Sequence, residues 1–475
     1  MAKRKRQSGP TGETPGEKLQ AKKPKALQVN GSGSAAAGET LQIVLGSYDQ
    51  VLHGLTATIP AKHGEADFAD TFLFNAHSSA IRCVAISPVS AKIPGQTQKV
   101  LLATGSTDER IHIYNLSAHP PSRRNQDMLA KVAPRPILEN PKNKELGTLL
   151  HHSSTVTALR FPTRSKLLSA SDDSTVAVTR TRDWSVLSSI KAPKAKAMGR
   201  PSGDTAPFGG TPSGVNDFAI HPSMKLMISV SKGERCMRLW NLVTGKKAGV
   251  LGFTRNMLQS VGEGKHSTGE GRRVVWGNVD GADEFAVGFE RGILVFGMDS
   301  VPKCKVVPSP RTKVHQFSYI ELGSDGELSL LAVSTEDGRI LFFSTASEDI
   351  EKASEDEGEE FGSAKYIGCV GGRDAGVSGR IKDFSIIRSE TDPGALYLIG
   401  ASSDGRVRIW LVTAKELGGS GKKTALGKLV GTYETKNRIT CMTAFLMIPR
   451  PDDAEESEDE AVDSVSGESD DEDSD

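Results

Sequence analysis

Hydrophobic and polar positions alternate in short runs along residues 215–251, which read VNDFAIHPSMKLMISVSKGERCMRLWNLVTGKKAGVL. The runs VNDFAI, KLMISV, CMRLWNL and KKAGVL are separated by the turn signals His-Pro-Ser, Ser-Lys-Gly-Glu and Val-Thr-Gly. Strands of about 5–6 residues between such signals are typical of an antiparallel sheet. Alternation places Phe218 and Ile220 on one face and Val215 and Ala219 on the other, so both faces are apolar. Such a sheet needs neighbours on both sides.

Five further stretches repeat this pattern. Residues 80–116, for example, contain AIRCVAISP, KVLLATGSTDE and RIHIYNL. A repeat of about 40–45 residues with a Trp-Asp-like pair at the end of its third strand is the signature of WD40 β-propellers. Together with residues 215–251 the repeats form six complete four-stranded units, or blades; the other five span 80–116, 155–190, 272–298, 312–345 and 380–412.

The seventh unit is divided between the two ends of the chain. RITCMTAFL at 438–446 has the pattern of a first strand, LQIVLGSYDQVLHGLTAT at 41–58 that of a second and third, and TFLFNAH at 71–77 that of a fourth. Pairing them closes a ring, from which we predict that no free sheet edge remains. The predicted fold is all-β: a seven-bladed WD40 β-propeller over 41–449, whose split blade is closed by 438–446 with 41–77.

Both ends outside this ring are polar and lack periodicity, so we predict a disordered basic N-terminal tail over 1–40 and a disordered acidic C-terminal tail over 450–475. Residues 1–25 carry eight basic and two acidic residues, whereas 452–475 carry fourteen acidic and no basic residues. A second acidic stretch lies at 346–361. The formal net charge of +0 therefore hides a basic ring with an acidic tail and an acidic loop.

The composition excludes two classes of protein. No apolar run approaches the about 18 residues that a membrane-spanning helix needs, and no apolar region of a secretory signal follows the basic N-terminus. The five cysteines are scattered and lack C-x-x-C spacing, which argues against disulfides and zinc and predicts core residues in a reducing compartment. They are Cys83, Cys236, Cys304, Cys369 and Cys441.

In a propeller, the turns between second and third strands and the links between blades share one face, which we call the top face. The insertions 117–145 and 346–361 follow third strands and belong to the opposite, bottom face, whereas 193–213 and 254–271 link blades at the top. Basic residues gather in the top turns and links. We predict a partner-binding top face that contains Arg110, Lys194, Lys196, Lys232, Arg235, Arg291, Arg339, Arg406 and Arg438.

The tails contain short signals. Two basic clusters predict a nuclear import signal, the alternative being a solvated basic tail; they comprise Lys3, Arg4, Lys5, Arg6, Lys22, Lys23 and Lys25. Ser354, Ser457 and Ser469 precede acidic residues, as in sites of acid-directed kinases, and are candidates for phosphorylation. The alternative is an unmodified, solubilising tail.

The sequence lacks the motifs of common enzyme sites. It contains no P-loop, G-x-S-x-G, H-E-x-x-H or G-x-G-x-x-G, and its histidines do not cluster at metal-ligand spacing. We predict no enzyme activity, no cofactor, no metal, no membrane and no small-molecule substrate. His77 and His152 precede first strands, where a structural bond to a turn acid such as Asp108 or Asp172 is expected, with Tyr114 completing the network. Aromatic residues are 5%, so any RNA contact would be made through phosphates.

The stretches AIHPSMKLMISV and MRLWNLVTGKKAGVL, preceded by TVTALRFPTRSKLLSASDDSTVAVTRTRDWSVLSSIKA, resemble the p21-activated-kinase-interacting, or maintenance-of-killer, WD40 family. The resemblance is sharpest over 151–251 and collinear through 272–449. Blade two departs from it, with Ala177, Val178 and Thr179 where a Trp is usual, and 193–213 is expanded.

This resemblance implies a nucleolar protein that joins large (60S) ribosomal subunit precursors and helps to load a ribosomal-protein-like placeholder factor. It also implies a second possibility, negative regulation of a p21-activated protein kinase. Both roles are binding roles, so the expected function is that of a scaffold. The partners are pre-60S proteins and pre-rRNA phosphates or, in the alternative, the kinase.

Overall fold

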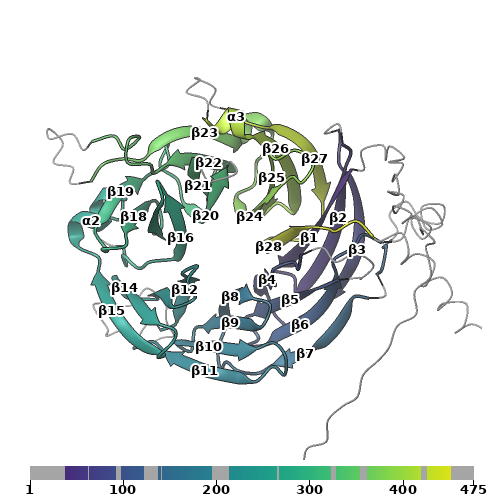
Figure 1. Ribbon diagram of the computed structural model, residues 1–475, viewed down its shortest axis with the longest axis horizontal. Helices are drawn as coiled ribbons and strands as arrows, with labels where there is room; N and C mark the ends of the chain where they lie inside the picture. Colours follow the sequence, from purple (N-terminus) through teal and green to yellow (C-terminus); the bar gives the residue numbers. More distant parts are fainter. Residues whose placement is uncertain are drawn as a thin grey trace, which may run out of the picture. The chain divides into compact units, whose positions relative to one another are not determined.

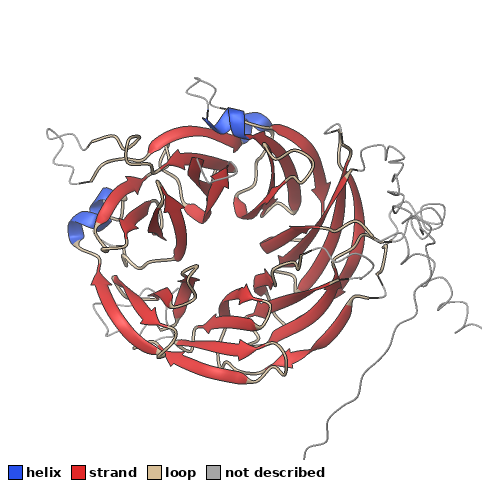
Figure 2. Cartoon of the chain, viewed as in Figure 1, coloured by secondary structure: helices blue, strands red, loops and turns tan. Residues whose placement is uncertain are grey.

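The structure is a computed structural model that describes residues 38–61, 64–91, 98–121, 137–140, 142–194, 213–264, 267–322, 328–352, 361–418 and 425–450. These residues form seven four-stranded antiparallel sheets arranged around a central axis (Figures 1 and 2). The fold is therefore a seven-bladed all-β propeller, as the repeats predicted. No helix of the described part is long and apolar enough to cross a membrane.

Six blades are formed by consecutive strands, the first of which lies innermost (Figure 1). Blade 1 contains β4 (Ile81–Ile86), β5 (Lys99–Ser106), β6 (Ile111–Ser117) and β7 (Lys144–Leu149); blade 2 contains β8 (Val156–Thr163), β9 (Lys166–Ser171), β10 (Thr175–Arg180) and β11 (Val186–Lys191); blade 3 contains β12 (Val215–Ile220), β13 (Leu226–Ser231), β14 (Cys236–Asn241) and β15 (Lys246–Gly252).

The next three blades follow the same order. Blade 4 contains β16 (Arg273–Val279), β17 (Ala282–Gly288), β18 (Ile293–Gly297) and β19 (Pro302–Val306); blade 5 contains β20 (Val314–Leu322), β21 (Leu328–Thr335), β22 (Arg339–Ser344) and β23 (Lys365–Gly371); blade 6 contains β24 (Ile381–Arg388), β25 (Ala395–Ser402), β26 (Arg406–Thr413) and β27 (Lys428–Glu434). In the described part of the chain, the helices are short and lie in connections between strands: α2 (Arg255–Ser260), η2 (Arg373–Ala375) and α3 (Ala414–Gly418).

Blade 7 joins the two ends of the chain, as predicted. Its order is β28-β1-β2-β3, with β28 (Ile439–Leu446) from the C-terminal end and β1 (Glu39–Ser47), β2 (Val51–Ile59) and β3 (Asp67–Asn75) from the N-terminal end. β28 pairs antiparallel with β1, and Val44 lies opposite Thr443. The fourth strand begins earlier than the predicted residue 71, because a bulge at Thr71 lets residues 67–70 continue the pairing.

The hydrophobic core is divided among the junctions between blades. Each of seven buried clusters draws its side chains from two adjacent blades. Alternation along each strand supplies both junctions: Ile228 and Val230 pack toward blade 4, whereas Met227 packs toward blade 2. The prediction for Val215 was wrong, because it packs on the same side as Phe218. A bulge after Val215 shifts the alternation by one residue.

The inner and outer strands carry regular bulges. Six of the seven described inner strands contain one near their top end, and β16 does not. All seven outer strands contain one opposite the middle of the third strand. A bulge leaves one residue unpaired and increases twist, which suits strands that must curve around the axis and the rim.

Four connections between third and fourth strands reach the outer strand of the preceding blade; we call them rim clasps. In three of them, one residue forms a parallel bridge and the next is buried and donates its N–H to the covered strand. The pairs are Ile137–Leu138 on Asp70 of β3, Ser363–Ala364 on Lys305 of β19, and Ala425–Leu426 on Cys369 of β23. In the fourth, Ala66 donates to the carbonyl of Val430 in β27 over 3.0 Å.

Candidate functional site: the top face of the ring

The topology places the predicted basic residues on one face. Seven of the nine lie in or beside a turn between a second and third strand, or directly before an inner strand. Lys194 is exposed and follows β11, and Lys196 lies outside the described residues. The import-signal residues and Ser354, Ser457 and Ser469 also lie outside them. The seven are Arg110, Lys232, Arg235, Arg291, Arg339, Arg406 and Arg438.

Five arginines of this face form no salt bridge with a carboxylate in the described part of the chain. The side chains of Arg110, Arg291 and Arg406 make no hydrogen bond or salt bridge there. Arg235 donates only to neutral carbonyl groups, that of Thr268 over 2.9 Å and that of Ser267 over 3.1 Å. Arg438 lies 5.2 Å from the ring centre of Tyr48, in a cation–π contact. Four of these charges are available to attract an anionic partner, and that of Arg291 is shared with the neighbouring Glu290, whose pKa it helps to lower.

The other two top-face cations are already paired. Lys232 Nζ lies 2.6 Å from a carboxylate oxygen of Asp172 in the preceding blade, and Arg339 Nη2 lies 2.6 Å from Asp337 in its own turn. Asp337 also accepts the Arg339 Nε–H at 2.8 Å, and these contacts help to hold the pKa of Asp337 below its usual value. These two residues contribute to the shape of the face more than to its charge.

A further cation, Lys382, lies at the top end of β24 and was not singled out in the sequence. Burial and then the charge of Arg380 lower its pKa to about 8. Glu336 is the carboxylate beside it, and it is shared by His315 at 2.6 Å and Arg380 at 3.0 Å. Burial lowers the pKa of His315 to about 4, so this ring is neutral at pH 7. Lys382 and Arg380 thus share one carboxylate, that of Glu336, and the excess positive charge favours a bound anion.

The predicted structural histidines do bond turn acids. His77 Nδ1 lies 3.0 Å from Asp108, and its Nε2 pairs with Thr104 Oγ1 at 2.8 Å. Tyr114 is not part of this network, because Thr104 occupies the second ring nitrogen. Burial lowers the pKa of His77, which keeps the ring neutral.

In blade 2 the prediction that Asp172 bonds His152 was wrong. His152 Nδ1 pairs with Asp173 at 3.0 Å, and its Nε2 lies 2.8 Å from Ser169 Oγ. Asp172 points to the neighbouring blade instead, where it pairs with Lys232. In both blades the histidine joins the turn to a hydroxyl of the second strand, a structural role.

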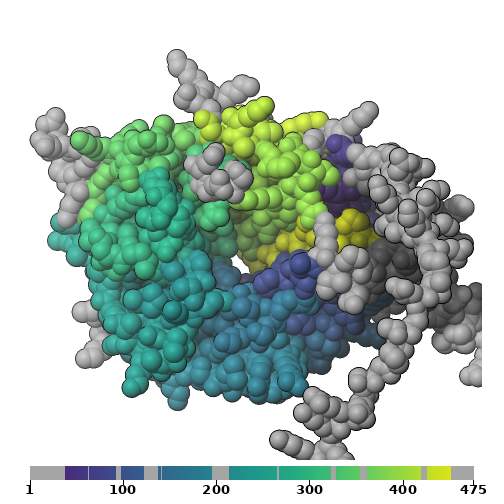
Figure 3. Space-filling view, viewed as in Figure 1, coloured from purple at the N-terminus to yellow at the C-terminus, as the bar shows by residue number. Residues whose placement is uncertain are grey.

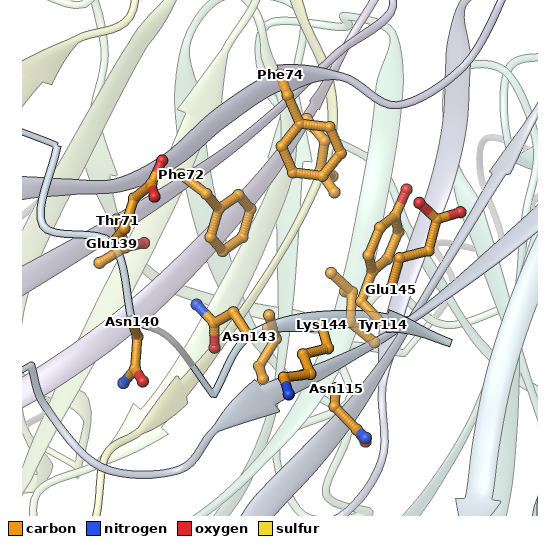
Figure 4. Close-up of a pocket in the computed structure, with 13 residues that line it drawn as sticks. Thr71, Phe72, Phe74, Tyr114, Asn115, Glu139, Asn140, Asn143, Lys144 and Glu145 are labelled. Atoms are coloured by element: carbon orange, nitrogen blue, oxygen red, sulfur yellow. The ribbon is translucent and has the colours of Figure 1, made fainter. Parts of the chain in front are cut away.

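A recess of about 250 Å³ lies at the junction of blades 7 and 1 (Figure 4). Phe72 and Phe74 form one wall, and the ring of Tyr114 meets Phe74 edge-on at 5.7 Å. Asn140 lies at the other end, where its Nδ2 atom is buried and has no partner in the described part. Burial raises the pKa of Tyr114, so its hydroxyl remains a donor. The recess combines an apolar wall with open polar groups, as binding pockets do.

The cysteines are core residues in three of the five cases. Cys236 and Cys369 are only half-buried, and Cys236 begins β14 beside the top turn, where its Sγ lies 3.9 Å from Glu234 Oε2. All five are free, and Cys83, Cys304 and Cys441 are buried. Burial raises the pKa of the Cys83 and Cys304 thiols to about 12, so they are not reactive at neutral pH. The described residues contain no group of three or more side chains that could hold a metal ion.

The seven four-stranded sheets and the repeats define a WD40-repeat propeller. Residues 69–115 and 143–178 match the model of the WD domain, G-beta repeat family. Protein MAK11 of Saccharomyces cerevisiae is 30% identical over 424 residues, which cover 85% of this chain and 82% of MAK11. The chain therefore belongs to the family of MAK11 and the p21-activated protein kinase-interacting proteins, and the resemblance noted in the sequence is confirmed.

Two other relatives carry names that refer to kinases. The p21-activated protein kinase-interacting protein 1-like of Gallus gallus is 25% identical over 86% of this chain and 80% of its own length. The Shk1 kinase-binding protein 15 of Schizosaccharomyces pombe is 23% identical over 86% of this chain and 84% of its own length.

Proposed function

We propose that this protein is a non-catalytic scaffold in the assembly of the large (60S) ribosomal subunit in the nucleolus. The observation that carries the proposal is the set of five arginines that form no salt bridge on one face of a rigid ring. Membership of the family supports it, because the resemblance implies this role.

The top face suits the phosphates of precursor rRNA and acidic surfaces of precursor proteins. Exposed guanidinium groups bind phosphates through charge-assisted hydrogen bonds and release counterions, without any base-specific contact. A ring held by seven buried clusters presents these groups at fixed positions, which lowers the entropy lost on binding. The acidic stretches at 346–361 and 452–475 are suited to basic ribosomal proteins, including a ribosomal-protein-like placeholder factor.

The test is sedimentation of tagged full-length variants in a sucrose gradient. Replacing the five unpaired arginines by Gln should move the protein from the large-subunit precursor fractions to the top of the gradient. A matched control replaces five exposed lysines at the bottom ends of strands and turns by Gln and should sediment like the wild type. Equal sedimentation of all three proteins, or wild-type protein free of precursors, would overturn the proposal. The arginines are Arg110, Arg235, Arg291, Arg406 and Arg438; the lysines are Lys99, Lys144, Lys166, Lys225 and Lys246.

The nucleolar location has its own test. Changing residues 3–6 and 22–25 to Ala removes the two basic clusters and should abolish the nuclear signal of a fluorescent fusion. Unchanged nucleolar fluorescence would show that these clusters are not the import signal.

The second candidate is an adaptor that binds and negatively regulates a p21-activated protein kinase. The names of the chicken and fission-yeast relatives favour it. A kinase assay with a saturating amount of the full chain distinguishes the two functions. Unchanged kinase activity would remove this candidate and leave the sedimentation test unaffected.

A further inference from the structure

The channel along the axis is a cavity that the proposed function does not use. The inner strands of all seven blades line it, and its volume is about 620 Å³. Figure 3 shows its opening at the centre of the ring. A cavity of this size is large enough for a small organic or inorganic ligand.

Three arginines from three blades line this cavity: Arg82 of β4, Arg160 of β8 and Arg273 of β16. Arg160 donates one N–H to the carbonyl of Leu159 and another to Asp217, at 3.3 and 3.4 Å. Arg273 approaches Asp217 only at 3.9 Å and makes no hydrogen bond in the described part. Arg82 is exposed to the channel and has no hydrogen bond or salt bridge there. Most of the N–H groups of the three side chains are therefore available.

The carboxylates of the channel do not balance these charges. Asp217 lies behind the wall, its side chain only 1% exposed, and it also accepts the backbone N–H of Val274 at 3.2 Å. Asp383 takes the corresponding position in blade 6 and accepts the N–H of Met442 at 2.9 Å. Burial raises the pKa of Asp383, which disfavours its charged form. The positive charges of Arg273, Arg160 and Arg82 also reach the buried Cys83 thiol, where they oppose the rise of its pKa.

We propose that the central channel is a binding site for a small anion with two or more phosphoryl groups, held by Arg82, Arg160 and Arg273. A carboxylate fits one guanidinium fork, whereas a chain of tetrahedral phosphoryl groups offers oxygens in several directions and can reach three forks at once. The seven inner strands that surround the channel exclude part of the solvent, which strengthens each contact relative to one on the outer surface. Such a ligand joins blades 1, 2 and 4 at the axis.

The test is isothermal titration calorimetry of the full chain with sodium tripolyphosphate at about 0.15 M salt, where open-surface attraction is screened. We expect saturable binding of one tripolyphosphate per chain. Arg273→Gln should weaken it about tenfold or more, since a charge-assisted contact is lost. Arg82→Gln should weaken it too, and it cannot disturb the fold through a lost hydrogen bond or salt bridge, because Arg82 makes none in the described part.

Two further variants separate the channel from the surface. Asp217→Asn should tighten binding about threefold or more, because a competing charge is removed while the amide oxygen can still accept the Val274 N–H. Arg438→Gln, on the top face, should leave the affinity unchanged. Absence of saturable binding, or equal weakening by Arg438→Gln and Arg273→Gln, would overturn the proposal. An affinity for tripolyphosphate that is unchanged in both the Arg82→Gln and the Asp217→Asn variants would also overturn the proposal.

A second probe identifies the source of the phosphoryl groups. Tighter binding of adenosine triphosphate than of tripolyphosphate assigns the site to a nucleotide, and equal or weaker binding assigns it to a non-nucleotide polyphosphate. Both results keep the phosphoryl chemistry. The measurement does not depend on the ribosomal role, because it needs neither RNA nor precursor particles.

Discussion

The junctions between blades are held together in two ways. From blade 4 through blade 7 to blade 1, each outer strand, namely β19, β23, β27 and β3, is covered by a rim clasp. From blade 1 to blade 4, the outer strands β7, β11 and β15 have no such cover in the described part of the chain. Apolar side chains stay exposed on all three, among them Leu146, Val186, Leu187 and Val250.

Both arcs are tied at the axis, the clasped arc by bonds such as that from Thr440 Oγ1 to the carbonyl of Ile81 at 2.6 Å. In the uncovered arc the axial ties act without clasps. Thr157 donates to the carbonyl of Val215 at 2.6 Å, and Asn216 donates to that of Gly271 at 2.8 Å, each bond joining one inner strand to the next blade. Asp217 adds its contacts with blades 2 and 4. Two of the four clasps, those on β27 and β3, hold blade 7 to its two neighbours, where only hydrogen bonds and packing join the two ends of the chain. Among the described residues, the uncovered arc therefore leaves three outer edges open to other strands, and the prediction that ring closure leaves no free sheet edge was wrong there.

Removal of residues 438–449 should have the largest effect, because it deletes the inner strand of the clasped blade. Ile439, Met442 and Phe445 are buried, and each contributes about 1.5–3 kcal/mol. Their sum, with the exposed edge of β1, is comparable to the whole stability of a domain. We expect loss of the cooperative thermal transition. Deletion of 451–475 removes none of the described contacts and should leave it unchanged; an unchanged transition in the first variant contradicts the closure.

Leu426→Ala should loosen one clasp. Leu426 is buried between blades 5 and 6 and donates its N–H to Cys369 at 2.8 Å. The lost packing should reduce the free energy of unfolding by about 2–4 kcal/mol. Leu429→Ala, three residues later but 47% exposed, should change it by less than about 0.5 kcal/mol. Similar melting temperatures for both variants would show that the clasp contributes little to the junction.

Asp217→Ala tests the axial ties of the uncovered arc. The substitution leaves Arg160 and Arg273 without their carboxylate and the Val274 N–H without an acceptor. It should therefore reduce the free energy of unfolding by about 2–3 kcal/mol.

Asp383→Asn is the matched change in the clasped arc, and its effect depends on pH. Because burial raises the folded pKa of Asp383, the folded state keeps this proton after the unfolded chain has lost it. Stability therefore falls as pH rises from about 4, the unfolded value, through the folded pKa. The Asn variant keeps an acceptor for Met442, lacks that decline and should be no less stable than the wild type at pH 7. Loss of stability at pH 7 with an unchanged pH profile would contradict this assignment.

The sequence predicts the ring because the information is local. Strand alternation and turn residues recur in every blade, and once the strand order is known, Arg110 and Arg406 must share a face. The predictions fail where a shift of one residue changes the direction of a side chain. The bulge after Val215 moves that side chain to the opposite junction, and Asp173 takes the role expected of Asp172.

The channel cluster and the clasps depend on contacts between distant blades, which one sequence does not pair. A signal was nevertheless present for the channel. The pair Asp217-Phe218 recurs as Asp383-Phe384 at the same place in an inner strand, where a charged residue is unusual. The clasps give a weaker signal, short apolar pairs such as Ile137-Leu138 within polar insertions.

Proline in an uncovered edge should have the smallest effect. Ala192 N–H bonds Ser174 in the antiparallel pair of β10 and β11, so alternation turns the N–H of Ser189 outward, away from β10. Ser189→Pro therefore removes no ladder bond and should change the free energy of unfolding by less than about 0.5 kcal/mol.

Lys305→Pro is the matched change in a covered edge, and it removes the bond from Lys305 N–H to the carbonyl of Gly362 at 2.8 Å. This variant should lower the free energy of unfolding by about 1–3 kcal/mol, because the carbonyl of Gly362 in the clasp loses its hydrogen-bond donor. Thermal unfolding of the two variants measures the difference between the arcs directly. If Ser189→Pro is the more destabilising, the outer edge of β11 is not free in solution, and another strand covers it.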